Sequence, residues 1–293
     1  MDNYNDYIKL MRPQQWLKNV FVFLPVFFDK YIMEWGHLYP VIITFAAFCL
    51  LSSSVYCFND IQDCAMDKLH PVKKFRPLAR GSISVAGAYV MMVLLALMSC
   101  CIMLYAELYK VLYIAAIYYT VNLAYCVKLK NIPIVDIFLI SSGFVLRIIS
   151  GGLASNIELS KWIVLMTFLL SLFLAFSKRL DDSRIYMKRN IKLRKNISSY
   201  NPDFIQLSLA IVSSITIVCY IMYSIDESVV NRIQNNYLYV TSIFVILGIL
   251  RFLQLVVVEK KCYSPTKMLI KDRFIQVCIA LWTIMFLVML YFN

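Results

Sequence analysis

The stretch "TFAAFCLLSSSVYCFNDIQDCAMDKLHPVKKFRPLARG", residues 44–81, joins a hydrocarbon-like run to a dense group of charges. Its apolar part belongs to a segment long enough to cross a bilayer, and the acidic group begins where that segment ends. The whole chain is 61% hydrophobic and 16% charged, and a soluble domain with this much apolar surface would aggregate. The sequence therefore predicts a membrane protein whose polar residues gather at one membrane surface.

Apolar runs of spanning length recur along the chain, which predicts an all-α polytopic membrane protein with nine transmembrane helices. Residues 1–293 are expected to form a single transmembrane catalytic domain. Polar clusters follow the second span ("CFNDIQD", 57–63) and the sixth ("FSKRLDD", 176–182), which suggests two pseudo-repeated four-helix halves plus a ninth helix around a central cavity open to the cytoplasm. Cytoplasmic loops at about 58–84 and 178–203 would cap the active site. The expected spans are 17–36, 38–57, 85–105, 109–127, 133–152, 161–177, 204–224, 237–257 and 273–292.

The net charge of +12 is explained by membrane topology rather than by nucleic-acid binding. Most lysines and arginines lie in the N-terminal segment and in the loops after the even-numbered spans. The opposite side carries Lys30, Lys110, Lys161 and Arg232. Cations near short loops stay in the cytoplasm, so we expect a cytoplasmic N-terminus, an external C-terminus and an active site facing the cytoplasm of the inner membrane. No basic-aromatic module accompanies the charge, so no nucleic-acid partner is expected.

The acidic group has the spacing of a metal-binding stripe. If the helix of the second span continues, Asn59, Asp60, Asp63 and Asp67 fall within about 100° of one helical face. Carboxylates this close repel one another unless a cation neutralises them. Mg²⁺ prefers hard oxygen ligands and usually joins protein carboxylates to substrate phosphates, which the following lysines and arginines would also hold. An ordinary solvated loop would account for the cations but poorly for the carboxylates.

"NDIQDCAMD" (59–67) resembles the NDxxDxxxD motif of the UbiA superfamily of intramembrane prenyltransferases. Together with "MRPQQWLKN" (11–19), "DIFLISSGFVLRIISGG" (136–152) and "PTKMLIKDR" (265–273), it looks like the decaprenyl-phosphate phosphoribosyltransferase branch. The resemblance implies transfer of 5-phosphoribose from phosphoribosyl pyrophosphate to a polyprenyl, decaprenyl-type phosphate, releasing pyrophosphate. The product would be a lipid-linked pentose donor for cell-envelope glycans. Expected partners are these two substrates and the bilayer, and a homo-oligomer is compatible with the sequence.

The region after the sixth span departs from the aromatic prenyltransferases of that superfamily, which carry a second acidic motif there, often DxxxD. In "SKRLDDSRIY" (177–186), Ile185 and Tyr186 stand four residues after Asp181 and Asp182. A second acidic motif suits a second metal on a prenyl diphosphate. The basic pair Lys178 and Arg179 suits an additional anion, such as the 5-phosphate of ribose.

The resemblance also implies roles for individual residues. Mg²⁺ would be held by Asn59, Asp63 and Asp67, with Asp60 completing the catalytic set. The acceptor phosphate is already anionic, so no general base is required. Arg147, deep in a span, would either line the central cavity and bind phosphate or serve a structural contact. The expected phosphate-binding cations, Arg147 aside, are Arg12, Lys18, Lys73, Lys74, Arg76, Arg80, Lys178 and Arg179.

Two other functions compete with this interpretation. The first is a prenyltransferase that moves a prenyl group from a prenyl diphosphate to an aromatic or quinone-precursor acceptor. The second is a transporter or channel with a metal-binding gate, which would favour ionisable residues through the bilayer. We count Arg147 alone as lying deep within a span, since the other charged residues of the expected spans lie toward their ends.

Overall fold

The computed structural model describes residues 2–69, 73–189, 196–260, 268 and 271–291. These residues form helices and turns and contain no strand. They divide into two compact units, Met1–Leu159 and Ser160–Asn293, which are described separately. Residues 70–72 and 190–195, within the two expected capping loops, lie outside the described part of the chain.

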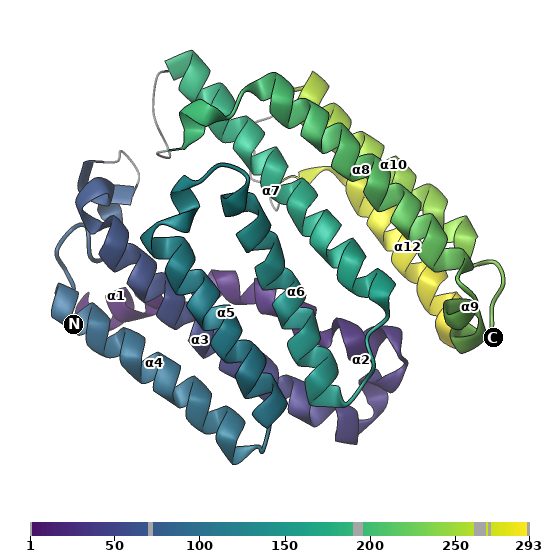
Figure 1. Ribbon diagram of the computed structural model, residues 1–293, viewed down its shortest axis with the longest axis horizontal. Helices are drawn as coiled ribbons and strands as arrows, with labels where there is room; N and C mark the ends of the chain where they lie inside the picture. The colour runs from purple at the N-terminus through teal and green to yellow at the C-terminus, as the bar shows by residue number, and fades with distance from the viewer. Residues whose placement is uncertain (1, 70–72, 190–195, 261–267, 269–270, 292–293) are drawn as a thin grey trace. The chain divides into compact units, whose positions relative to one another are not determined.

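The first unit is organised around α3, against which α1, η1, α4, α5 and α6 all pack (Figure 1). This helix runs over 35 residues, so it includes both the expected span at 38–57 and the acidic stripe after it. The elements of the unit are α1 (Asp2–Met11), η1 (Pro13–Phe23), α2 (Leu24–Phe28), η2 (Tyr31–Met33), α3 (Trp35–Leu69), η3 (Lys73–Phe75), α4 (Val85–Tyr105), α5 (Tyr109–Val127), η4 (Leu129–Asn131) and α6 (Val135–Ser155).

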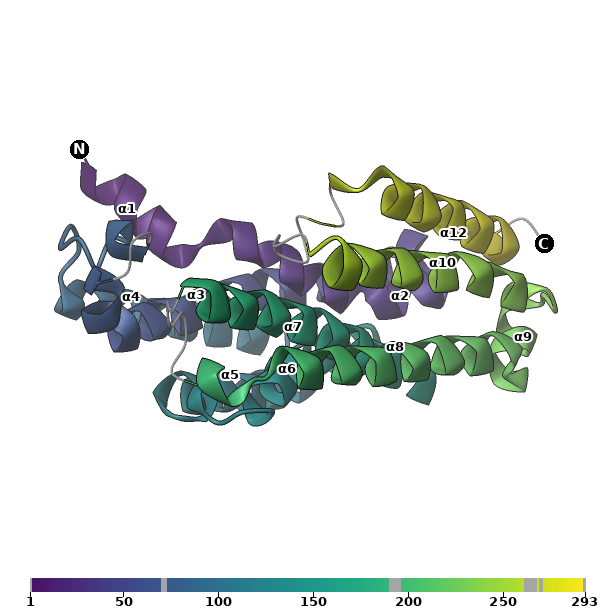
Figure 2. The same cartoon turned by 90° about the horizontal axis from the view of Figure 1, so that it is seen from above.

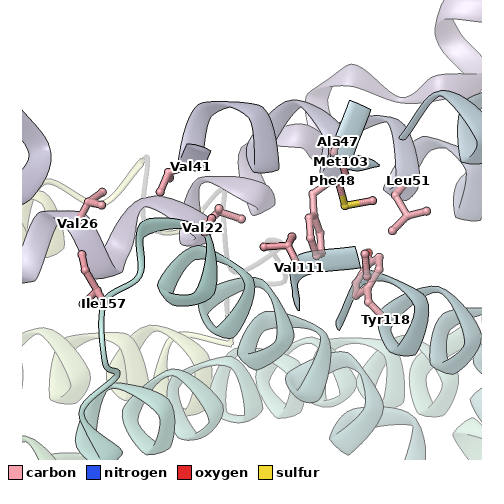
Figure 3. Close-up of a cluster of buried hydrophobic side chains, with 12 residues drawn as sticks. Val22, Val26, Val41, Ala47, Phe48, Leu51, Met103, Val111, Tyr118 and Ile157 are labelled. Atoms are coloured by element: carbon pink, nitrogen blue, oxygen red, sulfur yellow. The ribbon is translucent and has the colours of Figure 1, made fainter. Parts of the chain in front are cut away.

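The core of this unit is apolar and closely packed. Phe48 lies against Tyr118, with ring centroids 5.3 Å apart, next to Val111 (Figure 3). Gly151 of α6 lies so close to the backbone of η1 that an added Cβ would stand 2.0 Å from the carbonyl oxygen of Val22. Small residues allow such an approach between membrane helices. The first segment is thereby held tightly against α6.

The expected span at 17–36 is not one continuous α-helix. The chain passes instead through the 3₁₀ helix η1, the short helix α2 and the 3₁₀ turn η2. Pro25 lacks the N–H that an α-helix interior needs, and Lys30 adopts a left-handed backbone angle (φ 66°) between α2 and η2. This proline and this turn divide the expected span, and Arg12 (φ 53°) and Pro13 mark the start of η1.

The second unit pairs α7 with α8 and α10 with α12, as Figures 1 and 2 both show. A polar network ties three of its elements together: the Trp282 indole donates to the Tyr220 hydroxyl (2.6 Å), which lies 2.7 Å from the Thr241 hydroxyl. Its elements are α7 (Lys161–Arg189), η5 (Ile197–Ser199), α8 (Pro202–Ile225), α9 (Glu227–Ile233), η6 (Leu238–Thr241), α10 (Ser242–Leu253), the π-helix η7 (Gln254–Val258) and α12 (Arg273–Tyr291).

Within the described residues, eight helical segments are long and apolar enough to cross a membrane. They correspond to the expected spans from the second to the ninth. The boundaries differ chiefly where a span runs on as helix beyond its apolar part: α3 continues to Leu69, and α7 continues to Arg189. Both extensions carry the polar clusters found in the sequence.

Candidate active site

The four polar residues of the expected stripe all lie on the last turns of α3, so the prediction that the helix continues through them is confirmed. Asp60 and Asp67 are buried, with 2% and 3% of their surface exposed. The Asn59 amide donates a hydrogen bond to Asp63 Oδ2 at 3.2 Å. One helix therefore presents three carboxylates and an amide within about two and a half turns.

Cations from three other segments surround this stripe. Arg12, between α1 and η1, pairs with Asp60. Arg76 bridges two carboxylates, with Nη1 at 3.1 Å from Asp60 Oδ1 and 2.5 Å from Asp67 Oδ2. Lys73 Nζ lies 3.8 Å from Asp67 Oδ1, and Lys130 Nζ lies 2.6 Å from Asp63 Oδ1. Each carboxylate of the stripe thus has at least one cationic partner.

Arg12 reaches Asp60 from a left-handed backbone conformation. That conformation disfavours a non-glycine residue by about 1–2 kcal/mol. The guanidinium also lies over the Tyr56 ring, 5.1 Å from its centroid. The ion pair and this cation–π contact offset the backbone strain. Glycine would relax the backbone here but would leave Asp60 without this partner.

The oxygen donors of the stripe fit Mg²⁺ in chemical type, because carboxylate and amide oxygens are hard ligands. Among the described residues, however, no three His, Cys, Asp or Glu side chains converge closely enough to hold a metal ion. The ion pairs account for this: Asp63 is directed to Lys130, while Asp60 and Asp67 are both directed to Arg76. These side chains are metal ligands by chemical type, and in this structure they are paired with cations of the chain.

The remaining expected phosphate ligands of the first unit do not touch the stripe. Arg80 pairs with Asp6 of α1 and donates to Ser82 at 3.1 Å. The hydrogen bond from Arg80 lowers the pKa of Asp6. Lys18 and Lys74 are exposed, and the Lys74 ammonium lies 5.2 Å from the centre of the Phe75 ring. Arg80 is therefore held by α1, and none of these three cations forms an ion pair with an α3 carboxylate in the described residues.

Arg147 is buried in α6 and is bound by neutral groups. Its Nε donates to Asn19 Oδ1 (2.7 Å), its Nη1 to the Gly143 carbonyl (2.9 Å) and its Nη2 to the Tyr118 hydroxyl (2.7 Å). The guanidinium also lies over the rings of Tyr118 and Phe144. These contacts connect η1, α5 and α6, and they support the structural role considered for Arg147.

Removing one of these contacts gives a test of the network. We expect Tyr118→Phe to lower the free energy of unfolding by about 1.5–3 kcal/mol, because a buried N–H of a charged group loses its acceptor. Tyr113→Phe is the matched control, since Tyr113 lies on the same helix but is 69% exposed. Its effect should stay within about 0.5 kcal/mol. Thermal unfolding in detergent measures both, and equal midpoints would show that the network adds no stability.

The expected basic pair after the sixth span lies on α7, in the second unit. Lys178 is exposed, whereas Arg179 is 1% exposed and donates to Asp182 at 3.3 Å. Asp181 is also buried, and its Oδ1 receives no hydrogen bond from the described residues. The basic pair therefore presents one cation to solvent and one to a neighbouring carboxylate.

Three residues that contact the α3 carboxylates or Arg147 were not predicted from the sequence. Lys130 was counted among the topological cations, although its place in a loop on the same side as the stripe was a usable signal. Asn19 belongs to a block used for the resemblance, but no role was assigned to it. Tyr118 lies in an apolar helix, and its contact with Arg147 had no signature in the sequence.

Comparison with known proteins gives three consistent results. The sequence profile described as the UbiA prenyltransferase family matches residues 23–275. A decaprenyl-phosphate phosphoribosyltransferase of Mycolicibacterium smegmatis is 32% identical over 285 residues, covering 94% of this chain and 89% of that protein. The protein of the same name from Corynebacterium glutamicum is 31% identical over 284 residues, covering 94% and 83%.

Among solved structures, a UbiA homologue from Archaeoglobus fulgidus bound to DMAPP and Mg²⁺ superposes with a TM-score of 0.72. The match covers 97% of this chain and 99% of that chain at 19% identity. A structure described for digeranylgeranylglyceryl phosphate synthase gives a TM-score of 0.67 at 16% identity, covering 98% of both chains. At these identities the likeness establishes the fold.

Proposed function

The chain belongs to the UbiA prenyltransferase family, and from this premise we propose that it transfers 5-phosphoribose from phosphoribosyl pyrophosphate to a polyprenyl phosphate of decaprenyl type. Pyrophosphate is released, and the lipid-linked product serves as a pentose donor for cell-envelope glycans. The relatives named decaprenyl-phosphate phosphoribosyltransferase, similar over 94% of this chain, support this choice of substrates. The chain is an integral, multi-pass membrane protein, as its family and the eight apolar helices among the described residues indicate.

What supports the chemistry above all is the juxtaposition of the α3 carboxylates with cations that can accept phosphate. Arg12, Arg76 and Lys130 all lie within ion-pair distance of the stripe. Arginine binds phosphate oxygens with two parallel N–H donors, and lysine binds them as a point charge. We assign these residues and Lys73 to the diphosphate of the donor. The phosphate-binding roles of Lys18, Lys74, Arg80, Arg147, Lys178 and Arg179 stay predictions.

The reaction is a displacement at the anomeric carbon of the ribose. Arg12, Arg76 and Lys130 would neutralise the charge that grows on the departing pyrophosphate. Mg²⁺, held by Asn59, Asp63 and Asp67 with Asp60 nearby, would add charge neutralisation at the same oxygens. The nucleophile is a phosphate oxygen that is ionised at neutral pH, so the chain needs no general base. In-line attack would invert the configuration at that carbon.

The proposed architecture has nine crossings around a central cavity open to the cytoplasm. The eleven residues of η1 and the five of α2 extend about 30 Å together at about 2.0 and 1.5 Å per residue, which matches the hydrocarbon thickness. This segment would make the first crossing, from a cytoplasmic N-terminus, and leave the C-terminus outside. A single catalytic domain over residues 1–293 and a homo-oligomer stay predictions.

The activity is tested by incubating the purified protein with Mg²⁺, phosphoribosyl pyrophosphate labelled in the ribose and polyprenyl phosphate. We expect label to move into the organic phase only when all three are present, and chelation of the metal should abolish the transfer. A parallel reaction supplies a prenyl diphosphate and an aromatic acceptor. Prenylation of that acceptor, with the ribose label left in the aqueous phase, would contradict the proposal and favour the aromatic prenyltransferase.

A further inference from the structure

The ion pairs at the end of α3 join three carboxylates to cations of other segments. Three carboxylates, Asp60, Asp63 and Asp67, face four cations from other segments: Arg12, Lys73, Arg76 and Lys130. The formal charges of this set of seven side chains sum to +1. Its members are held tightly, since Asp60 and Asp67 are buried and the Lys130–Asp63 distance is 2.6 Å.

A divalent ion that enters this set alone meets two obstacles. It must draw the carboxylates away from their partners, and it leaves Arg76 and Lys130 beside an added double charge. Removing the partner of a charge that is shielded from water is costly. A diphosphate removes both obstacles, because its oxygens can accept the same N–H donors while its negative charge compensates the metal.

We infer that the metal and the diphosphate enter this site together, by an exchange in which the cations move from the carboxylates to the diphosphate as the carboxylates move to the metal. The metal-free chain is kept in order by its own cations and has little affinity for a divalent ion alone. This inference rests on the proposed role of the α3 carboxylates as metal ligands. It adds an order of binding that the proposed function does not require.

Lys130 is the best position at which to test the exchange. Its ammonium is the cation paired with Asp63, whereas Arg76 contacts two carboxylates and its loss would disturb both. Lys128 provides a matched control, because it precedes Lys130 by two residues and is exposed. In the described part of the chain it makes no ion pair with the stripe. Replacing either lysine by alanine removes the same charge from the same loop.

The experiment is equilibrium dialysis of the full chain in detergent against labelled Mn²⁺, with and without inorganic pyrophosphate. For the parent protein we expect pyrophosphate to tighten Mn²⁺ retention at least tenfold, with one pyrophosphate retained per metal ion. Lys130→Ala should bind Mn²⁺ alone about tenfold more tightly than the parent, equivalent to about 1.4 kcal/mol. It should also lose much of the gain from pyrophosphate, while Lys128→Ala behaves as the parent does.

The sign of the Lys130→Ala effect decides between explanations. If Lys130 merely orients Asp63, its removal weakens the binding of Mn²⁺ alone, and the exchange is wrong. Unchanged Mn²⁺ binding also overturns it. Lys130→Arg, which keeps the charge, should restore the parent's dependence on pyrophosphate and shows that a change in Lys130→Ala is not misfolding. The dialysis is independent of ribosyl transfer. A failed transfer assay beside a positive dialysis result would therefore reject the proposed substrates but not the exchange.

Discussion

Asp63→Asn is expected to lower kcat for ribosyl transfer by at least about 100-fold while leaving the chain folded. The substitution keeps the size of the side chain but removes the negative charge that would bind the metal and that now holds Lys130 at 2.6 Å. Metal-based charge stabilisation contributes several kcal/mol, and each factor of ten in rate corresponds to about 1.4 kcal/mol. Steady-state rates at saturating Mg²⁺ and donor, with the unfolding temperature recorded in parallel, provide the measurement.

Asp203→Asn is the matched control for this variant. Asp203 is exposed in the first turn of α8, on the side of the membrane where we expect the active site, and it takes no part in the stripe. The same loss of charge there should change kcat less than about twofold, because exposed substitutions away from special features have small effects. Comparable losses of activity in the two variants would mean that general surface charge, rather than the α3 stripe, supports catalysis.

Gly151→Ala should be the most destabilising single-methyl addition in the first unit. The added Cβ would lie 2.0 Å from the Val22 carbonyl oxygen and 2.9 Å from its carbonyl carbon. Both atoms belong to the backbone, so no side chain can rotate away, and η1 must separate from α6. We expect a loss of more than about 3 kcal/mol, at the upper end of the effects of overpacking. The yield of monodisperse protein and its unfolding temperature in detergent would report this loss.

Gly248→Ala makes the same chemical change where space exists. The nearest atom to its added Cβ is Cys278 Cβ at 3.8 Å, an ordinary contact, and Gly248 lies inside α10. Alanine is also the better helix former, so this variant should be neutral or slightly more stable than the parent. An unfolding temperature of Gly151→Ala close to that of Gly248→Ala would show that η1 and α6 do not need their close approach.

Much of the fold follows from hydrophobic runs, because each run must satisfy its backbone hydrogen bonds within the membrane as a helix. Eight of the nine expected spans are apolar helices in the described residues, and α3 carries the helical extension from Asn59 to Asp67. The first span was expected to be broken by Pro25, but the sequence did not predict the 3₁₀ segments that make up most of residues 13–33. Hydropathy measures apolar length, whereas Pro13, Pro25 and two left-handed residues determine the backbone there.

The acidic residues of the candidate site could be predicted from the sequence, whereas their cationic partners were harder to predict. Helical spacing is a local property of one segment, and it was enough to predict Asp60, Asp63 and Asp67. Lys130 and Arg12 reach the stripe from segments 67 and 48 residues away from their partners, and tertiary packing alone decides that they meet it. The contact of Arg147 with Asn19 spans 128 residues and has the same origin.

The length of α3 sets the height at which the two substrates meet. Thirty-five residues at about 1.5 Å each make a rod of about 52 Å, against about 30 Å of hydrocarbon, and Asn59 stands about 36 Å from its start. Placed with its first residue at one edge of the hydrocarbon, α3 would bring its carboxylate-bearing end to the level of the lipid headgroups on the other side. A water-soluble sugar donor could then bind without entering the hydrocarbon, and a lipid acceptor could react with its phosphate still at the leaflet surface.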